Sequence, residues 1–262
     1  MRYSILASGS TGNAFLIEAK KTRFLIDVGI SARRVESALE AFGISLEALS
    51  GIWISHEHDD HVRGLYALLK KAPLPLYMNA ATYAALKPKL PPVDVPVHIF
   101  PTGTRHRFYD LEVSTFAVSH DAVDPMMFRF TEVGGPSLVY LTDLGFVSER
   151  VKAAIEGAEA YVFEANHDVA MLRVGRYPWP LKRRILSDVG HLSNDDAAYA
   201  LADVVHKTTR RIHLAHLSQE NNVPEIARLS VVDILVRESV LSDADARVDV
   251  ARPDAPSPLL SL

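Results

Sequence analysis

The sequence predicts an α/β sandwich in which two packed sheets carry helices on their outer faces. Short apolar runs near the N-terminus are joined as hairpins, whereas later strands alternate with helical segments. The chain has 262 residues, of which 48% are hydrophobic and 23% charged, so it can bury a large core. No repeat or low-complexity linker divides it. We therefore expect one domain over residues 1–251 and a proline-containing C-terminal tail over residues 252–262.

Apolar runs bounded by turn-forming residues predict the strands of both sheets. In the first half these runs span residues 2–7, 14–19, 22–28, 51–55 and the stretch around Leu76. In the second half they span residues 111–119, 127–131, 137–142, 160–164 and 211–216.

Helical segments are predicted where apolar residues recur every three or four positions. Val35, Leu39 and Phe42 show this spacing. Ser31 can cap the start of that helix and Gly43 can end it. Further helices are predicted over residues 61–71, 80–86, 149–155, 195–207 and 224–239.

The composition narrows the kind of protein. There is no cysteine, so disulfides and thiolate metal sites are excluded, and nitrogen and oxygen atoms must hold any metal. No apolar run approaches the ~20 residues that span a membrane. The N-terminus also lacks the apolar core of a signal peptide, so we expect a cytoplasmic protein. A formal net charge of -4 means that any contact with nucleic acid is local.

One segment, IWISHEHDDHVRGL, carries the strongest chemical signal. His56, His58 and Asp60 alternate directly after a buried strand, so an extended chain points their side chains the same way. His61 then starts a helix and turns back toward the same place. The alternative is an exposed polar loop that is rich in His and Asp. Four ligand-type residues within six positions instead predict a metal site.

Three later residues can supply the ligands that a second metal ion needs. His120, Asp143 and His216 each follow an apolar run directly, where a strand ends and a loop begins. Taken singly, such residues are more often caps or turn residues. Together with the first motif they predict a site for two divalent ions. Zinc suits the imidazoles, and manganese is compatible with the carboxylates.

With these residues in place, the chain resembles the metallo-β-lactamase fold hydrolases, and within them the YycJ (WalJ) family. The resemblance covers most of the chain and rests on LASGSTGNAFLIE, FEANHD, GHLSNDDAA and LAHLSQENN. The last two segments are also similar to the C-terminal His motifs of ribonuclease Z. The resemblance implies an αββα sandwich of two mixed sheets. It also implies nuclease chemistry, because YycJ-like proteins are associated with DNA exonuclease activity and many relatives are phosphodiesterases.

The resemblance divides the candidate ligands into two sets that share one bridging carboxylate. One ion would be bound by His56, His58 and His120. The second would be bound by Asp60, His61 and His216. The carboxylate that bridges both would be Asp143.

Two residues near the N-terminus are candidates for roles close to the metals. Asn13 ends SGSTGN, a turn that either brings polar groups close to the substrate or is only a tight turn. Asp27 follows an apolar run and is expected to accept the N–H of a ligand histidine. Its alternative role is to cap the strand.

Polar residues in FEANHD and GHLSNDDAA are candidates for catalysis and substrate contact. A helix that starts near Ser193 places His191 where it can meet a phosphate or protonate a leaving oxygen. The resemblance assigns this histidine to the substrate phosphate. Glu164 can orient His191, and Asn166 and His167 can contact substrate, as can Ser193. Surface capping is the alternative for these residues.

The segment RVGRYPWPLKRR interleaves cations with aromatic rings. Arg183 and its neighbours can hold phosphates while Tyr177 and Trp179 stack with bases, as in sites for single-stranded nucleic acid. A charged loop with two packed aromatic residues is an equal alternative.

The predicted reaction is hydrolysis of a phosphodiester by a hydroxide that bridges two metal ions. Asp60 would hold the nucleophile in line and His191 would protonate the departing oxygen. The expected substrate is nucleic acid, and the expected function is that of a 5′-to-3′ DNA exonuclease. The alternatives are a phosphodiesterase of small cyclic substrates, a thioester or lactam hydrolase, and a metal-binding protein without turnover.

Overall fold

The computed structural model describes residues 1–262 and contains strands β1 to β14 and helices α1 to α10. The strands are β1 (Arg2–Ala7), β2 (Ala14–Glu18), β3 (Arg23–Ile26), β4 (Gly51–Trp53), β5 (Leu76–Met78), β6 (Val97–Ile99), β7 (Arg105–Phe108), β8 (Leu111–Ala117), β9 (Met126–Glu132), β10 (Ser137–Leu141), β11 (Ala160–Glu164), β12 (Arg211–Ala215), β13 (Val248–Val250) and β14 (Leu260–Ser261). The helices are α1 (Ala32–Ala41), α2 (Asp59–Val62), α3 (Leu65–Lys71), α4 (Ala80–Leu86), α5 (Glu149–Ile155), α6 (Val169–Val174), α7 (Trp179–Ile185), α8 (Asn194–Val204), α9 (Pro224–Arg237) and α10 (Ala244–Arg247). Two short 3₁₀ helices span Leu46–Ala48 and Lys87–Lys89.

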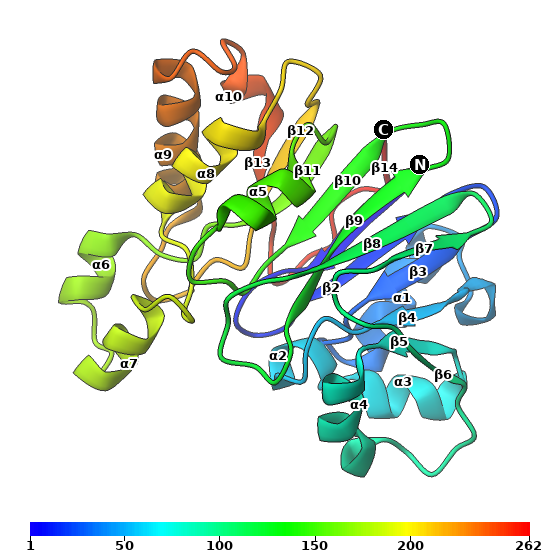
Figure 1. Cartoon of the computed structure of the whole chain (residues 1–262). Coiled ribbons are helices and arrows are strands. Elements are labelled where there is room, and N and C mark those ends of the chain that lie inside the picture. The colour runs from blue at the N-terminus through cyan, green and yellow to red at the C-terminus, as the bar shows by residue number, and fades with distance from the viewer.

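The strands form two seven-stranded sheets that face each other. Their orders are β14-β1-β2-β3-β4-β5-β6 and β13-β12-β11-β10-β9-β8-β7. Helices α1, α3 and α4 lie outside the first sheet, and α5, α8 and α9 lie outside the second (Figure 1). The predicted sandwich of helices around two mixed sheets is therefore confirmed.

Each sheet changes from antiparallel to parallel pairing part-way across. In the first sheet, β1, β2 and β3 are antiparallel neighbours, whereas β3 to β6 run parallel. In the second, β7 to β10 are antiparallel and β10 to β13 are parallel. The carboxyl ends of the parallel strands are where the loops of α/β proteins collect ligands. The site is therefore expected at this end of both sheets.

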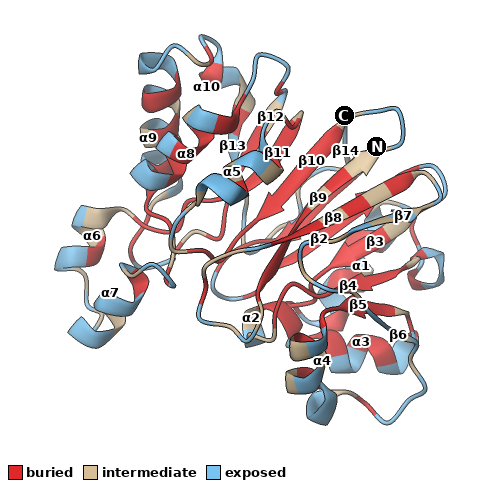
Figure 2. Ribbon diagram, viewed as in Figure 1, coloured by how far each residue is buried: buried red, intermediate tan, exposed pale blue.

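One cluster of 71 buried apolar residues fills the space between the sheets and beneath the helices. The central strands are buried along their whole length, while the helices expose their outer faces (Figure 2). Trp53 is fully buried, stacks on Tyr77 at 5.1 Å between ring centroids and meets Phe24 edge-on. Burial of this apolar area is the main stabilising contribution to the fold.

The structure differs from the predicted elements in several places. The helix predicted over residues 61–71 is divided into α2 and α3 at Gly64. A Cβ at Gly64 would lie 1.9 Å from the carbonyl oxygen of Ile30, so the chain can pass there only with glycine. The residues predicted as a C-terminal tail include β14, in which Leu260 pairs with Tyr3 of β1. Strands β6, β7 and β13 and helices α6, α7 and α10 were not predicted.

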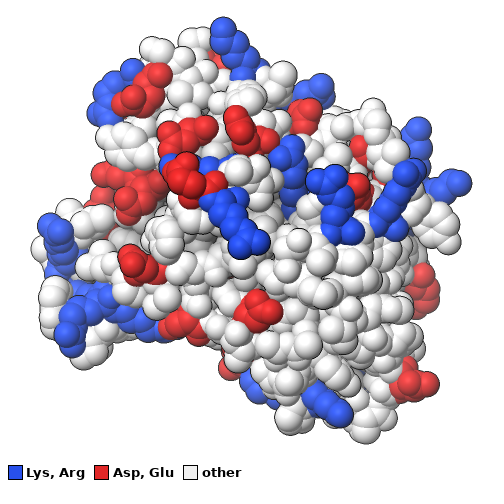
Figure 3. All heavy atoms as spheres, viewed as in Figure 1, with Lys and Arg blue, Asp and Glu red and all other residues white.

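Positive charge gathers at one edge of the molecule, over α6 and α7 (Figure 3). The cationic residues of this segment are Arg173, Arg176, Lys182, Arg183 and Arg184. None of the helices combines the length and apolar character that a membrane crossing requires.

Candidate metal centre

The candidate ligands, and Asp27 beside them, lie where strands end at one end of the sandwich. Asp27 follows β3, Asp143 lies two residues beyond β10, and His216 follows β12. All three have φ between 56° and 59°, a left-handed conformation that non-glycine residues rarely adopt. Such strain persists where surrounding contacts hold the residue in place, and it is concentrated at functional sites.

Three imidazoles form the first group of possible ligands. His56 and His58 follow β4, and His120 lies beyond the end of β8. Nε2 of His120 lies 3.3 Å from Nδ1 of His58. Nε2 of His56 is buried and has no hydrogen-bond partner. This arrangement places three ring nitrogens, each able to ligate a metal, close to one another, as the binding of a divalent ion requires.

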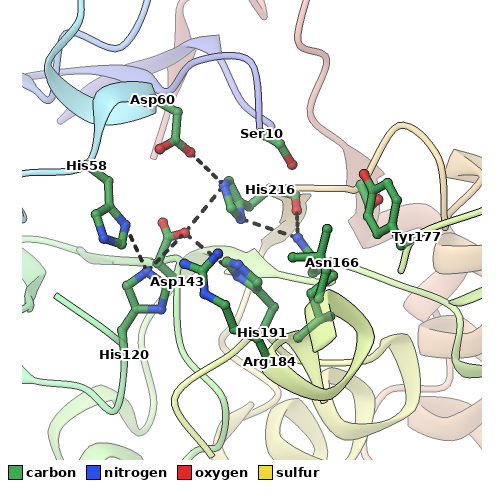
Figure 4. A pocket seen from close by; sticks show the side chains of 13 residues that line it. Ser10, His58, Asp60, His120, Asp143, Asn166, Tyr177, Arg184, His191 and His216 are labelled. Atoms are coloured by element: carbon green, nitrogen blue, oxygen red, sulfur yellow. Dashed lines mark hydrogen bonds and ion pairs between the residues drawn. The ribbon is translucent and has the colours of Figure 1, made fainter. Parts of the chain in front are cut away.

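Two carboxylates and two imidazoles form the second group: Asp60, His61, Asp143 and His216. Nε2 of His216 lies 3.2 Å from Oδ2 of Asp60 and 3.4 Å from Oδ1 of Asp143. Nε2 of His61 lies 2.9 Å from Oδ2 of Asp143. The same Asp143 carboxylate also approaches Nε2 of His120, at 4.0 Å. Asp143 therefore lies between the two groups, as Figure 4 shows.

Asp27 and Ser55 fix the proton positions on two of the imidazoles. Oδ2 of Asp27 accepts the Nδ1 proton of His61 at 2.7 Å. The Ser55 hydroxyl donates to the same carboxylate at 2.7 Å, so it accepts from Nδ1 of His56 at 2.9 Å. With Nδ1 occupied in this way, both rings turn an Nε2 lone pair toward the site. Outer hydrogen bonds of this kind orient metal-binding histidines.

Glu164 orients two further imidazoles on the opposite side of the site. Its Oε1 accepts from Nδ1 of His216 at 2.9 Å and from Nδ1 of His191 at 2.8 Å. His120 donates from Nδ1 to the backbone oxygen of Gly190 at 3.3 Å. The inward nitrogens of these rings are thus left free.

The imidazole nitrogens and carboxylate oxygens that face one another in the site require a positive charge between them. The Nε2 lone pairs of His61 and His216 point at the oxygens of Asp60 and Asp143. Acceptors that face acceptors in a buried site repel each other unless a proton or a metal ion lies between them. The two groups, rich in imidazole and carboxylate and free of sulfur, fit divalent metal ions.

The mutual attraction of these groups appears in their pKa values. Burial alone would lower the pKa of His61, but the Asp143 and Asp27 carboxylates outweigh it and raise that pKa well above its ordinary value. The pKa of His216 is raised for the same reason, chiefly by Asp143. Burial would raise the pKa of Asp143, but the facing His216 and His61 hold it well below the usual range. Protons and metal ions therefore compete for these imidazoles.

A cavity of about 240 Å³ opens onto the candidate metal centre. It is lined by Ser10, His58, Asp60, His120, Asp143, Asn166, Tyr177, Leu181, Arg184, Ile185, His191, His216 and Ser218. His191 and Asn166, which we predicted as site residues, are among them. Asn166 donates to the backbone oxygen of His216 at 2.8 Å (Figure 4).

Four residues predicted to contact substrate do not line the cavity. Asn13 is fully buried, and its amide nitrogen lies 3.1 Å from Nε2 of His61, the atom that faces the site. Ser193 is buried and caps α8 through the backbone N–H of Asp196. His167 is buried outside the cavity, and burial lowers its pKa to about 4. Arg183 is exposed, but α7 turns it away from the cavity and presents its neighbour Arg184 instead.

Several lining residues were not predicted, although the motifs that contain them were noted. Ser10 belongs to SGSTGN and Ser218 to LAHLSQENN. Tyr177 and Arg184 belong to the basic aromatic segment, in which Tyr177 was predicted to stack with bases; the prediction did not extend to their position in the cavity wall. Arg184 forms an ion pair with Asp121, next to the candidate ligand His120.

Comparison with known proteins identifies the family. A family model described as the beta-lactamase superfamily domain matches residues 22–217. The exodeoxyribonuclease YycJ of Bacillus anthracis is 46% identical over 90% of this chain and 89% of its own length. The chain belongs to the beta-lactamase superfamily and, within it, to the YycJ/WalJ family. A second YycJ/WalJ member, the exodeoxyribonuclease WalJ of Streptococcus pneumoniae, is 42% identical over 100% of this chain and 98% of that protein. The family resemblance read from the motifs is confirmed.

Solved structures share the fold of this YycJ/WalJ-family chain at low sequence identity. The metallo-β-lactamase fold protein YhfI of Bacillus subtilis superposes with a TM-score of 0.73 and 17% identity over 98% of both chains. Zn²⁺-bound PqqB of Methylobacterium extorquens superposes with a TM-score of 0.71 and 19% identity over 100% of both chains. The short form of human tRNase Z superposes with a TM-score of 0.67 and 17% identity, also over 100% of both chains.

Proposed function

We propose that this chain is a metal-dependent phosphodiesterase that removes nucleotides from DNA ends in the 5′-to-3′ direction. The observation that carries the proposal is that His191, which Glu164 positions, lines one cavity together with five of the seven candidate ligands, and that the other two, His56 and His61, are grouped with them. The 46% identity to an exodeoxyribonuclease over most of both chains supports DNA as the substrate. A DNA substrate also agrees with the expected cytoplasmic location.

Two divalent ions, zinc or manganese, would occupy the two groups of ligands. The three imidazoles would hold the first ion: His56, His58 and His120. The mixed group would hold the second, with Asp143 shared: Asp60, His61, Asp143 and His216. When bound, such a pair would lower the pKa of a water molecule and neutralise charge on a phosphate.

Side chains at the cavity would complete the chemistry. Asp60 is only partly buried and would orient the attacking water in line with the phosphorus. Nδ1–H of His191 is hydrogen-bonded to Glu164, which orients the ring; when the ring carries a second proton, on Nε2, that proton would pass to the departing sugar oxygen. Burial would raise the pKa of Glu164, but His191 and His216 outweigh it and lower that pKa to about 2. Glu164 therefore stays ionised and positions His191.

The function is tested on purified protein with its metal content measured. A 5′-to-3′ exonuclease should release labelled mononucleotide from 5′-labelled single-stranded DNA and give a ladder of shortened products from the 3′-labelled strand. His58→Ala should abolish both, together with bound metal. His206→Ala is the matched control, because His206 is exposed and lies outside the site.

Other substrates give the outcomes that would reject the proposal. Hydrolysis confined to cyclic nucleotides or chromogenic diesters would assign the site to small phosphodiesters. Cleavage of precursor RNA in preference to DNA would assign it to RNA processing. Bound metal without turnover of any of these substrates would leave a binding protein.

A further inference from the structure

Helices α6 and α7 concentrate unpaired positive charge beside the cavity. Residues 169–184 hold five of the 28 Lys and Arg and none of the 32 Asp and Glu. Two of these cations are already engaged: Lys182 is buried and donates to the backbone oxygens of Arg173 and Gly175 at 2.7 Å, and Arg184 pairs with Asp121. The other guanidinium groups are exposed and belong to no ion pair: Arg173, Arg176 and Arg183.

Two aromatic side chains lie among these cations. Tyr177 lines the cavity that contains the candidate ligands (Figure 4). Trp179, at the start of α7, is 59% exposed, which is unusual for so large an apolar side chain. Trp179 and Arg183 are one helical turn apart and so lie on the same side of α7. Leu181, on another side of the helix, faces the cavity.

The segment therefore continues the cavity wall outward with aromatic rings and free guanidinium groups. Its positive charge is seen at the edge of the molecule in Figure 3. Stacking rings with arginines between them suit a single nucleic-acid strand, because every base has a flat face and every linkage a negative charge. A role limited to packing does not account for Trp179, since most of its ring meets solvent.

We propose that residues 169–185, the α6–α7 platform, hold the single strand of the substrate where it leaves the cavity. Tyr177 and Trp179 stack with bases, and the three free arginines bind phosphates. This inference rests on the proposed function as a nuclease. It adds a preference for single-stranded ends and a binding site for the strand outside the cavity, away from the scissile bond.

Tryptophan fluorescence tests the platform without any need for turnover. The chain has two tryptophans, and Trp53 is fully buried in the core. Adding an oligothymidylate with phosphorothioate linkages to the metal-loaded protein should quench the red-shifted emission of Trp179 and leave that of Trp53 unchanged. Trp179→Phe should remove the quenching but keep most of the affinity. Trp179→Ala should weaken binding about ten-fold.

The salt dependence of binding tests the arginines. Replacing both Arg176 and Arg183 by Ala should reduce the slope of log affinity against log salt by about 0.7 for each lost phosphate contact. The matched control is Lys207→Ala with Arg210→Ala, which removes two exposed charges from the opposite end of β12 and should leave the slope unchanged. Hydrolysis of a small chromogenic diester reports whether the metal centre of each variant is intact.

The outcomes separate this inference from the proposed function. Quenching and a reduced slope in a protein that hydrolyses no diester would support the platform and reject the nuclease. DNA hydrolysis without quenching, and with an unchanged slope in the double variant, would overturn the platform. The exposed Trp179 face would then serve another role, such as docking a protein.

Discussion

Oδ2 of Asp27 accepts the Nδ1 proton of His61 at 2.7 Å, and both side chains are fully buried. The same carboxylate also receives the Ser55 hydroxyl and backbone N–H, so it fixes His56 through Ser55 as well. One residue that is not itself a candidate ligand therefore orients an imidazole in each of the two ligand groups.

Asp27→Asn tests this arrangement with little change in shape. Asparagine tolerates the left-handed conformation of position 27, where φ is 59°, so the backbone should be preserved. The neutral amide accepts less strongly and can reverse the tautomer of His61. We expect metal affinity to fall about 10- to 100-fold, measured by competition with a chelator. Asp203→Asn, on the exposed side of α8, should have the affinity of the parent protein.

His191→Ala should slow hydrolysis in a way that depends on the leaving group. If His191 gives a proton to the departing oxygen, its loss should lower kcat on DNA by about 10²- to 10⁴-fold. A p-nitrophenyl diester loses a stable phenolate that needs no proton, so its hydrolysis should fall much less. Equal losses on the two substrates would show that His191 only binds the phosphate. Glu156→Gln alters an exposed Glu–His pair and serves as a control for Glu164→Gln, which should resemble His191→Ala.

The buried His213 should make folding stability depend on pH. Burial lowers its pKa to about 4, whereas it is about 6.5 in an unfolded chain. The unfolded chain thus binds a proton that the folded chain excludes, and stability falls as pH decreases from about 6.5 to about 4. His213→Gln keeps an acceptor for the Tyr3 hydroxyl, which lies 2.7 Å away, but does not titrate.

Urea unfolding of the metal-free protein measures this effect. Relative to His213→Gln, the parent should lose about 2–3 kcal/mol between pH 7 and pH 4.5. Parallel losses in the two proteins would refute the assignment to His213.

Gly29→Ala should disturb the backbone beneath the metal site. A Cβ at Gly29 would lie 1.7 Å from the backbone oxygen of Asp60 and 2.6 Å from the nitrogen of Asn13. Since neither backbone atom can move freely, we expect a loss of stability of about 1–3 kcal/mol and weaker metal binding, because Asp60 is displaced. In the control Gly135→Ala, the new methyl group meets only the Glu132 side chain, so denaturant unfolding should change little.

The sequence predicted the interior strands and the metal ligands because both have local signatures. Strands such as β10 and β11 are buried on both faces and therefore read as continuous apolar runs. The edge strand β7, with the sequence RHRF, is half exposed and charged, and no apolar pattern distinguishes it from a loop. Helix α7 was missed because Pro178 and Pro180 suggested a loop, although proline is compatible with a first helical turn.

The residues that support the site were harder to predict than the ligands. The role of Asp27 could be anticipated, since a polar residue at a strand end beside a histidine cluster suggests an acceptor. The position of Asn13 next to Nε2 of His61 could not be anticipated, because it depends on how Gly29 packs against the loop of Asp60. Tyr177 and Arg184 reach the cavity only because α7 folds back against it.

The left-handed backbone at Asp27, Asp143 and His216 also bears on how the protein can be engineered. Each of these positions costs on the order of 1–3 kcal/mol that a glycine would not incur. A screen that selects only for heat resistance will therefore favour glycine at the very positions that chemistry requires. Thermostable variants selected in that way should be tested for metal content before they are taken as improved enzymes.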